Sequence, residues 1–169
     1  NLKNDLMKHQ IAAYEKIKNI KVGALFMDMG TGKTRTAIEL IKYRKEAGKL
    51  NKVFWICPVS TKENLRLEIY KHSNYTAERI EKYLDEDICI VGIESISQSD
   101  VIYMKFRSLL EKENDIMIII DESHTIKNHT SKRTQRMIES SSFAKYRLIM
   151  TGTPVTQGVW DLFTQFYFL

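Results

Sequence analysis

The stretch VGALFMDMGTGKT, residues 22–34, places a short apolar run directly before a glycine-rich turn that ends in Lys33 and Thr34. The apolar run predicts a buried strand over Val22 to Met27, and the helical spacing that follows predicts a helix over Thr34 to Ala47. A glycine-rich turn between a strand and a helix lets backbone N–H groups surround phosphate oxygens, and the helix dipole favours negative charge there. This stretch therefore predicts a phosphate-binding site.

A second motif, Asp121-Glu122-Ser123-His124, follows another apolar run, Ile116 to Ile120. Each motif comes where a buried parallel strand is expected to end. In open α/β sheets, ligands bind outside the carboxyl ends of the strands, so the two motifs are expected to converge on one nucleotide. A nucleoside triphosphatase is the leading hypothesis.

The composition is that of an ordinary globular protein. The chain has 169 residues, of which 43% are hydrophobic and 28% charged, which suits a single domain over residues 1–169. Its net charge of +5 permits a polyanionic partner without requiring one. Cys57 and Cys89 lie in apolar segments, so we expect buried free thiols rather than a zinc site. No apolar run is long enough to cross a membrane, and because the first residue is Asn1 we expect a fragment or a processed chain.

Apolar runs alternate with helical segments along the rest of the chain, which predicts an α/β fold with a mainly parallel twisted sheet. The further strands expected are Lys52 to Cys57, Ile88 to Val91 and Arg147 to Met150, and the further helices Lys62 to His72, Val101 to Glu111 and Ser131 to Ser140. Gly48 fits a helix stop, and Ser60 or Thr61 fits a helix N-cap. The polar stretch His72 to Asp87 predicts a solvated helix or loop.

The two motifs divide the chemistry of phosphoryl transfer between them. Lys33 would contact the β and γ phosphates, and the Thr34 hydroxyl and Asp121 would bind Mg²⁺, while Glu122 would orient the attacking water. The general phosphate-loop pattern asks for glycine where this chain has Met27. The alternatives are a plain turn with a surface lysine, and a helix cap with a solvated acidic loop.

Together these residues resemble the first RecA-like lobe of superfamily-two helicases, and within it the Swi/Snf-related DNA translocase ATPases. Residues 28–34 resemble motif I and residues 121–124 resemble motif II. The subfamily is indicated by Ile126-Lys127-Asn128 with residues 131–134, and by residues 148–154, which resemble motif III. The resemblance covers nearly the whole chain and implies a three-layer RecA-like P-loop domain.

The resemblance also implies site residues. It assigns ATP as the nucleotide, with Gln10 reading adenine through its carboxamide. The implied nucleotide contacts are Gln10, Met29, Gly30, Thr31, Gly32, Lys33, Thr34 and Arg35. The implied catalytic residues are Lys33, Asp121 and Glu122, and those that couple hydrolysis to movement are His124, Thr151, Gly152 and Thr153.

Double-stranded DNA is the partner that the resemblance implies. Residues 56–60 are similar to motif Ia, and residues 91–95 to the next backbone-contacting motif, although Ile93 stands where an aromatic residue is often found. The implied nucleic-acid contacts are Pro58, Ser60, Lys62, Gly92, Lys127 and Lys132. Tracking along a backbone needs positive charge rather than base readout, which suits these lysines.

In this family ATP lies between two RecA-like lobes, and the second lobe supplies arginines that stabilise the transition state. We therefore expect residues 1–169 to be a first lobe that binds nucleotide but hydrolyses it poorly alone. The expected location is the cytoplasm of a bacterium or of a virus-infected cell, or the nucleus of a eukaryote. The alternatives are a DEAD/DEAH-type RNA helicase, a restriction-type motor subunit, or a nucleotide-binding module that docks a partner without hydrolysis.

Overall fold

The computed structural model describes residues 14–15, 18–26, 32–122 and 131–151. In these residues the elements are, in chain order, β1 (Val22–Phe26), α3 (Lys33–Glu46), β2 (Lys52–Cys57), the 3-10 helix η1 (Val59–Thr61), α4 (Lys62–His72), β3 (Ala77–Arg79), β4 (Ile88–Gly92), α5 (Ile93–Gln98), α6 (Asp100–Lys112), β5 (Ile116–Glu122), α7 (Lys132–Ser141) and β6 (Tyr146–Thr151).

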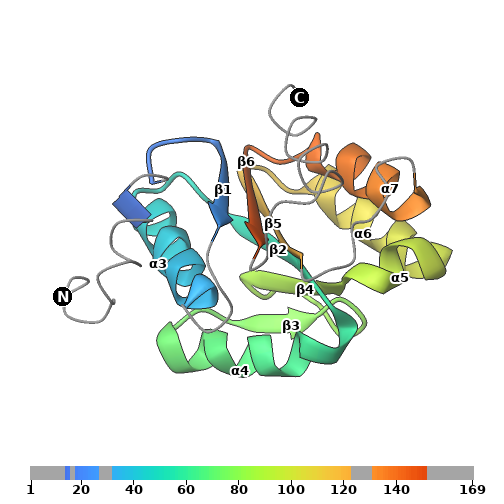
Figure 1. Ribbon diagram of the computed structural model, residues 1–169, viewed down its shortest axis with the longest axis horizontal. Helices are drawn as coiled ribbons and strands as arrows, with labels where there is room; N and C mark the ends of the chain where they lie inside the picture. Colours follow the sequence, from blue (N-terminus) through green and yellow to red (C-terminus); the bar gives the residue numbers. More distant parts are fainter. Residues whose placement is uncertain (1–13, 16–17, 27–31, 123–130, 152–169) are drawn as a thin grey trace.

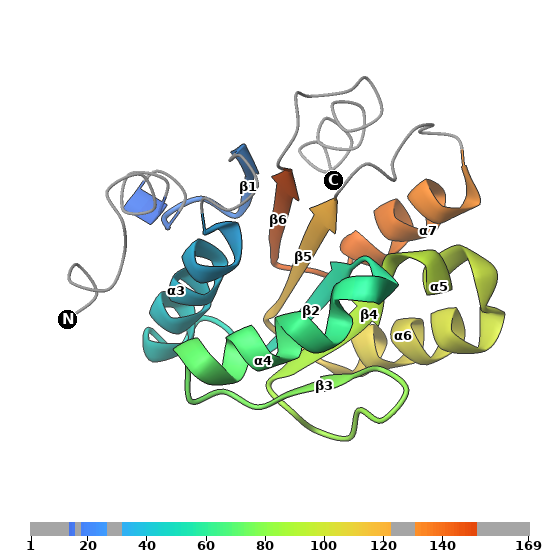
Figure 2. The ribbon, with the colours of Figure 1, turned by 60° about the horizontal axis from the view of Figure 1, so that its bottom comes forward.

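The strands form one sheet in the order β1-β6-β5-β2-β4-β3, with every neighbouring pair parallel. Figure 2 shows the arrowheads of β5 and β6 pointing in the same direction. Parallel strands need crossover connections that place helices on the faces of the sheet. The carboxyl ends of all these strands therefore meet along a single edge.

Helices cover both faces of the sheet, so the molecule has three layers (Figure 1). One core joins α3 and α4 to alternate strand residues such as Trp55, Ile90 and Ile119. The other joins α5, α6 and α7 to the intervening residues such as Phe54 and Ile118. Both faces of each central strand are thus buried, which explains why the strands are continuous apolar runs in the sequence.

The structure confirms the α/β class and the five predicted strands, whose described ends lie within two residues of those expected. Gly48 ends α3 as predicted: its φ is +71°, and Gly48 N and Lys49 N donate to the carbonyls of Lys45 and Arg44. Thr61 occupies the N-cap position of α4, but its hydroxyl donates to the carbonyl of Pro58 instead of capping the helix.

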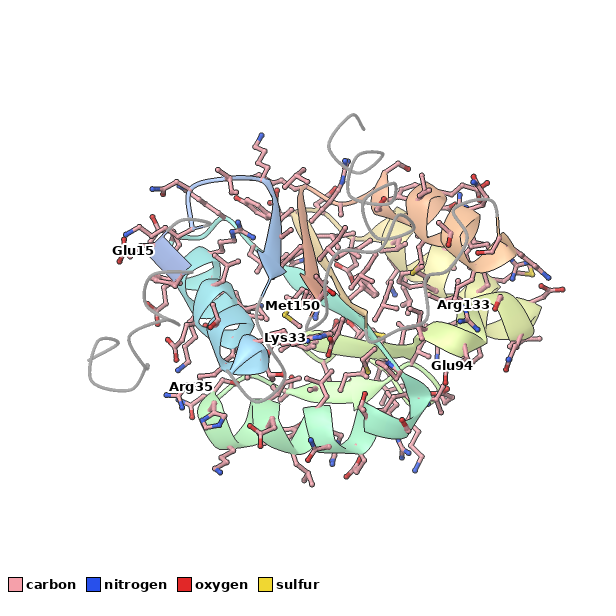
Figure 3. The ribbon with its side chains drawn as sticks, viewed as in Figure 1. Glu15, Lys33, Arg35, Glu94, Arg133 and Met150 are labelled. Atoms are coloured by element: carbon pink, nitrogen blue, oxygen red, sulfur yellow. The ribbon has the colours of Figure 1, made fainter. Side chains whose placement is uncertain are left out.

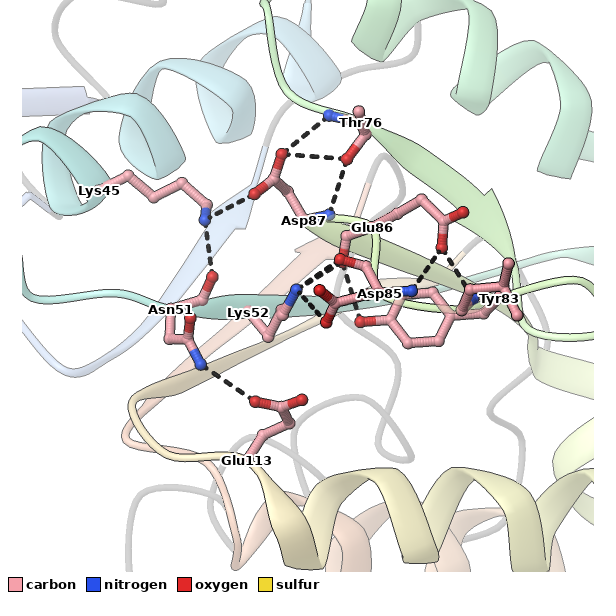
Figure 4. Close-up of polar contacts among 10 residues, drawn as sticks. Lys45, Asn51, Lys52, Thr76, Tyr83, Asp85, Glu86, Asp87 and Glu113 are labelled. Atoms are coloured by element: carbon pink, nitrogen blue, oxygen red, sulfur yellow. Dashed lines mark hydrogen bonds and ion pairs between the residues drawn. The ribbon is translucent and has the colours of Figure 1, made fainter.

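The polar stretch from His72 to Asp87 was predicted wrongly as only a solvated helix or loop. It contains the edge strand β3, and Ile80 and Tyr83 are buried. The Lys52 ammonium holds the loop after β3 by donating to the carbonyls of Asp85 and Glu86, at 2.6 Å and 3.2 Å (Figure 4). The pattern of apolar and polar residues did not reveal this strand, because hydrogen bonds between polar groups hold most of the segment in place.

A buried arginine fixes the position of α3 against the sheet. Arg44 Nη2 donates to the Ile20 carbonyl at 2.6 Å, and the guanidinium stacks on the Tyr146 ring at 4.1 Å from the ring centre. Burial lowers the pKa of Arg44 to about 10, which still leaves it charged at neutral pH. The helix that carries Lys33 is therefore anchored both to the start of β1 and to β6.

Candidate functional site

The register of the strands brings the two sequence motifs to one edge of the sheet. Thr151, the last residue of β6, pairs with Phe26 of β1 and with Glu122 of β5. The end of β1, which leads to the glycine-rich turn, is therefore one strand away from the end of β5, which carries the acidic motif. For the described residues, the two motifs thus lie at one edge of the sheet, as expected, while their convergence on one nucleotide stays a prediction.

The described part of the glycine-rich turn begins at Gly32, which is the N-cap of α3. Its φ of +83° lies in the left-handed region, where a side chain would be strained. The carbonyl of Gly32 accepts from Thr36 N at 3.0 Å and from Thr36 Oγ1 at 3.1 Å. The N-cap glycine has no side chain of its own to cap α3, and the first turn of the helix has no acidic residue. This helix start suits a bound anion.

Lys33 and Asp121 face each other across the site. Lys33 Nζ lies 3.7 Å from Asp121 Oδ1, and the two side chains are only 13% and 22% exposed. Figure 3 shows Lys33 reaching from α3 toward the ends of the central strands. The pair joins the first residue of the helix that follows the glycine-rich turn to the acidic motif. A phosphate that took Lys33 as its partner and a metal ion that took Asp121 would therefore lie side by side.

Arg35, expected among the nucleotide contacts, has protein partners. Its Nη1 lies 2.7 Å from Nδ1 of His72 in α4, and its Nε lies 3.5 Å from Glu39. Thr34 is half-buried in the first turn of α3. Several other expected site residues lie outside the described residues: Gln10, Met29, Gly30, Thr31, His124, Lys127, Gly152 and Thr153.

The acidic motif continues the sheet through two residues. Asp121 and Glu122 extend β5 beyond the predicted strand end, and their backbones pair with Met150 and Thr151 of β6. Thr151, expected to couple hydrolysis to movement, is buried at 1% exposure in the end of β6. It is thus held between the two motif-bearing strands.

The segment after β2 holds three expected nucleic-acid contacts. Pro58 precedes the short helix η1, and its carbonyl accepts both the amide and the hydroxyl of Thr61. Ser60 is exposed, whereas Lys62 Nζ lies 3.2 Å from Glu81 and its side chain is 13% exposed. The turn therefore presents Ser60 to solvent while Lys62 is paired.

Gly92, also expected at nucleic acid, has a packing role. A Cβ at this position would lie 2.5 Å from Cγ2 of Val59, which is closer than atoms tolerate. Two residues on, the Glu94 carboxylate accepts from Val59 N at 3.2 Å and 3.3 Å. Glu94, labelled in Figure 3, was missed by the sequence analysis and fixes the turn that bears Ser60. Its sequence clues were its place just after a strand and within residues 91–95, which resemble a backbone-contacting motif.

The basic residues at the start of α7 are paired with neighbouring helices. Lys132 Nζ lies 3.5 Å from Asp100, in a pair exposed on both sides. Arg136 binds the same carboxylate at 2.7 Å and also donates to the Ile96 carbonyl at 2.8 Å. Arg133 Nε donates to Ser97 at 3.3 Å. Of these, Lys132 is the side chain that remains most exposed.

The two cysteines take no part in a metal site within the described residues. Cys57 and Cys89 are buried, as expected, and burial raises the pKa of the Cys57 thiol to about 12. Among the described residues, no group of three or more His, Cys, Asp or Glu side chains is arranged so that it could hold a metal ion. A Mg²⁺ ion does not need such a cluster, because it keeps waters and phosphate oxygens as ligands.

Within the described ranges, no helix is both long and apolar enough to span a bilayer.

Comparison with known proteins gives a consistent family. The model of the SNF2-related domain matches residues 9–169. The chain is 30% identical over 159 residues to nucleoside triphosphatase I of Choristoneura fumiferana entomopoxvirus, covering 85% of this chain and 23% of the relative. It is 33% identical over 168 residues to the ISWI chromatin-remodeling complex ATPase ISW1 of Saccharomyces cerevisiae, covering 90% of this chain and 14% of the relative.

The fold matches as well. The Sulfolobus solfataricus SWI2/SNF2 ATPase core in complex with dsDNA superposes with a TM-score of 0.74 at 22% identity, covering 95% of this chain and 35% of that one. The chain thus spans about a third of that core and less than a quarter of the two relatives. A family model that covers residues 9–169 confirms the Swi/Snf-related resemblance: this chain belongs to the SNF2-related domain family.

Proposed function

We propose that this chain is the ATP-binding first motor lobe of an ATP-dependent translocase on double-stranded DNA. The observation that carries the proposal is the Lys33–Asp121 pair, 3.7 Å apart, which joins the first residue of α3 to the end of β5. A phosphate site and a metal site on adjoining elements are what magnesium-dependent phosphoryl transfer requires. Family membership supports ATP as the nucleotide.

The triphosphate would bind at the start of α3. The backbone of the turn, with Gly30, Thr31 and Gly32, would surround the phosphates, and Lys33 would contact the β and γ groups. Gln10 would read the adenine edge, with Met29 beside the nucleotide. These assignments follow the family motif at these positions.

The donor set fits Mg²⁺. The Thr34 hydroxyl and the Asp121 carboxylate are hard oxygen ligands on adjoining elements, and few protein ligands are the rule for this ion. When bound, Mg²⁺ neutralises charge on the phosphate oxygens. Glu122 would hold the attacking water, and His124, Thr151, Gly152 and Thr153 would relay the nucleotide state to the rest of the motor.

The ion pair keeps both charges of the site neutralised. Lys33 and Asp121 lie in a setting where both side chains are largely shielded from solvent. Isolated charges in such a setting are unfavourable, so pairing preserves both ionised groups. The nucleotide would supply a partner for Lys33, and the metal ion a partner for Asp121. Binding would therefore replace the ion pair with two contacts and leave both charges neutralised.

Hydrolysis would need a second RecA-like lobe. The chain covers 35% of the SWI2/SNF2 core to which it is similar in fold, which leaves most of such a motor to other residues. An arginine supplied from outside is worth roughly 10³- to 10⁵-fold in rate. The 169 residues alone are therefore expected to bind ATP and turn it over slowly.

Double-stranded DNA is the proposed track. The SWI2/SNF2 ATPase core of similar fold was solved in complex with dsDNA. The net charge of +5 of this chain also suits a polyanionic partner. The proposed backbone contacts are Pro58, Ser60, Lys62, Gly92, Lys127 and Lys132. With relatives from a poxvirus and from yeast, the expected location is the cytoplasm of an infected cell or a bacterium, or a eukaryotic nucleus.

The test is ATP hydrolysis by the full-length protein that contains this chain, with duplex DNA, single-stranded DNA, duplex RNA or no nucleic acid. We expect duplex DNA to stimulate hydrolysis most, and Lys33→Ala to abolish it. Stimulation by RNA but not by DNA would replace the proposal with an RNA helicase. Nucleotide binding without hydrolysis under any condition would replace it with a binding module.

A further inference from the structure

Arg35 points away from the nucleotide side of α3. It comes two residues after Lys33, and two residues turn a helix by about 200°, so the two side chains lie on opposite sides of the first turn. Figure 3 shows Lys33 and Arg35 in this arrangement. The Arg35 guanidinium is bonded to α4 through His72 and to Glu39 on its own helix. Its geometry is that of a link between helices.

The link continues along α4. An arginine can only donate, so His72 Nδ1 accepts from Arg35 at 2.7 Å, and the proton of the neutral ring is on Nε2. Nε2 then donates to the Glu68 carboxylate at 3.1 Å, one turn earlier in α4. Arg35, His72 and Glu68 therefore form a chain of hydrogen bonds with one consistent direction.

The far end of α4 reaches the proposed nucleic-acid segment. The helix has 11 residues, and its first residue, Lys62, directly follows η1 and Pro58. Figure 1 shows one end of α4 beside α3 and the other toward α5. At that second end, Glu94 accepts from Val59 N. A single straight helix thus connects the first turn of α3 to the turn that bears Ser60.

We propose that Arg35 is a positioning residue, which acts through His72 to hold α4 in register with the phosphate-binding turn of α3. The inference rests on the proposed function and deepens it: movement of the first turn of α3 on nucleotide binding is passed to α4, and through α4 to the backbone-contacting turn. A helix such as α4, which contacts one site at each of its ends, is a physical basis for coupling between the two sites. Arg35 does not bind the nucleotide itself.

The experiment uses the full-length protein with Arg35→Met, His72→Ala and the double variant. We expect each single change to lower the stimulation of ATP hydrolysis by duplex DNA about tenfold, the double variant to lose no more, and the KM for ATP to change less than about threefold. Lys71→Ala, an exposed neighbour on α4, is the matched control and should keep full stimulation.

Conservative variants separate positioning from a general loss of structure. Arg35→Lys retains a charged donor and His72→Gln retains an acceptor and a donor, so both should recover part of the stimulation. The inference is overturned if Arg35→Met raises the KM for ATP more than about tenfold while His72→Ala does not, since Arg35 would then be a phosphate ligand. It is equally overturned if both variants respond to DNA like wild type. A wild-type protein without any response to DNA would overturn the proposed function together with this inference.

Discussion

Two helices of this molecule, α3 and α7, both begin with a lysine, yet the two helix starts are built differently. At α7 the Ser131 hydroxyl caps the helix by accepting from Thr134 N at 3.2 Å. Lys132 is 55% exposed there and pairs with an Asp100 that is 70% exposed. At α3 the N-cap is Gly32, which has no side chain, and Lys33 is 13% exposed opposite Asp121.

The difference supports the proposal that the start of α3, and not that of α7, binds a ligand. A serine cap satisfies one of the amides at the start of a helix, and an exposed ion pair contributes little because water screens it. At α3 the place of the cap is taken by a glycine, and Lys33 and the carboxylate opposite it are largely shielded from water. The same residue at the same helix position is therefore a surface charge in α7 and a site charge in α3.

Replacing each lysine gives the largest contrast. Lys33→Ala removes a charged donor from the proposed phosphate site, which is expected to weaken binding of a fluorescent ATP analogue by about 3 kcal/mol, roughly a hundredfold. Lys132→Ala, at the same position of α7, is the matched control and should leave the affinity unchanged. Equal effects of the two substitutions on affinity would contradict the comparison.

Asp121 and Asp100, the carboxylates that pair with the two lysines, provide the second contrast. Asp121→Asn removes the proposed metal ligand, so the gain in nucleotide affinity on adding Mg²⁺ should fall about tenfold. Affinity measured in a chelator should stay the same or rise, because the repulsion between the carboxylate and the phosphates is lost. Asp100→Asn serves as the control and should retain the full response to Mg²⁺. An unchanged response in Asp121→Asn would exclude this residue as the ligand.

Changing the two N-cap residues should alter stability by similar amounts and binding by different amounts. Ser131→Ala loses a helix cap, and Gly32→Ala forces a side chain into a left-handed backbone, so each should lower the free energy of unfolding by about 1 kcal/mol in urea titrations. Nucleotide affinity should fall in Gly32→Ala alone. If Ser131→Ala lowered the affinity as much, the start of α3 would have no special place in binding.

The smallest effect concerns the pH dependence of the α7 pair. The hydrogen bond from Arg136 and the charge of Lys132 hold the pKa of Asp100 below its usual 3.8. A lowered folded pKa stabilises the fold above pH 3.8 and ceases to do so as pH falls through the folded value. Asp100→Asn should therefore lower the urea midpoint slightly at pH 7 and less at pH 3. A larger difference at pH 3 than at pH 7 would contradict the assignment.

The sequence was sufficient to predict the α/β class and the approach of Lys33 to Asp121. Continuous apolar runs mark strands buried on both faces, and parallel strands bring their carboxyl ends to one edge. The short strand β3, Ala77–Arg79, was missed because three residues without a β-branched run have no readable period. The same limit applies to α5, which has six residues.

The hydrogen bonds of Arg35 and Glu94 could not be predicted from the sequence for a different reason. Arg35 follows the phosphate-loop motif directly, which favoured a nucleotide contact, whereas its partner His72 lies 37 residues away along the chain. Glu94 is separated from Val59 by 35 residues. Such pairs depend on how α3, α4 and α5 pack against the sheet, and no local pattern of spacing or charge records that packing.

The central claim, that the triphosphate binds at the start of α3 and not at other helix starts, can be tested by hydrogen exchange. The exchange rates of individual amides would be compared with and without a slowly hydrolysed ATP analogue and Mg²⁺. We predict slower exchange at Lys33, Thr34 and Arg35 and at the end of β5, with no change in the first turn of α7. Saturating nucleotide that leaves the start of α3 unprotected, or protects the start of α7 equally, would contradict the account.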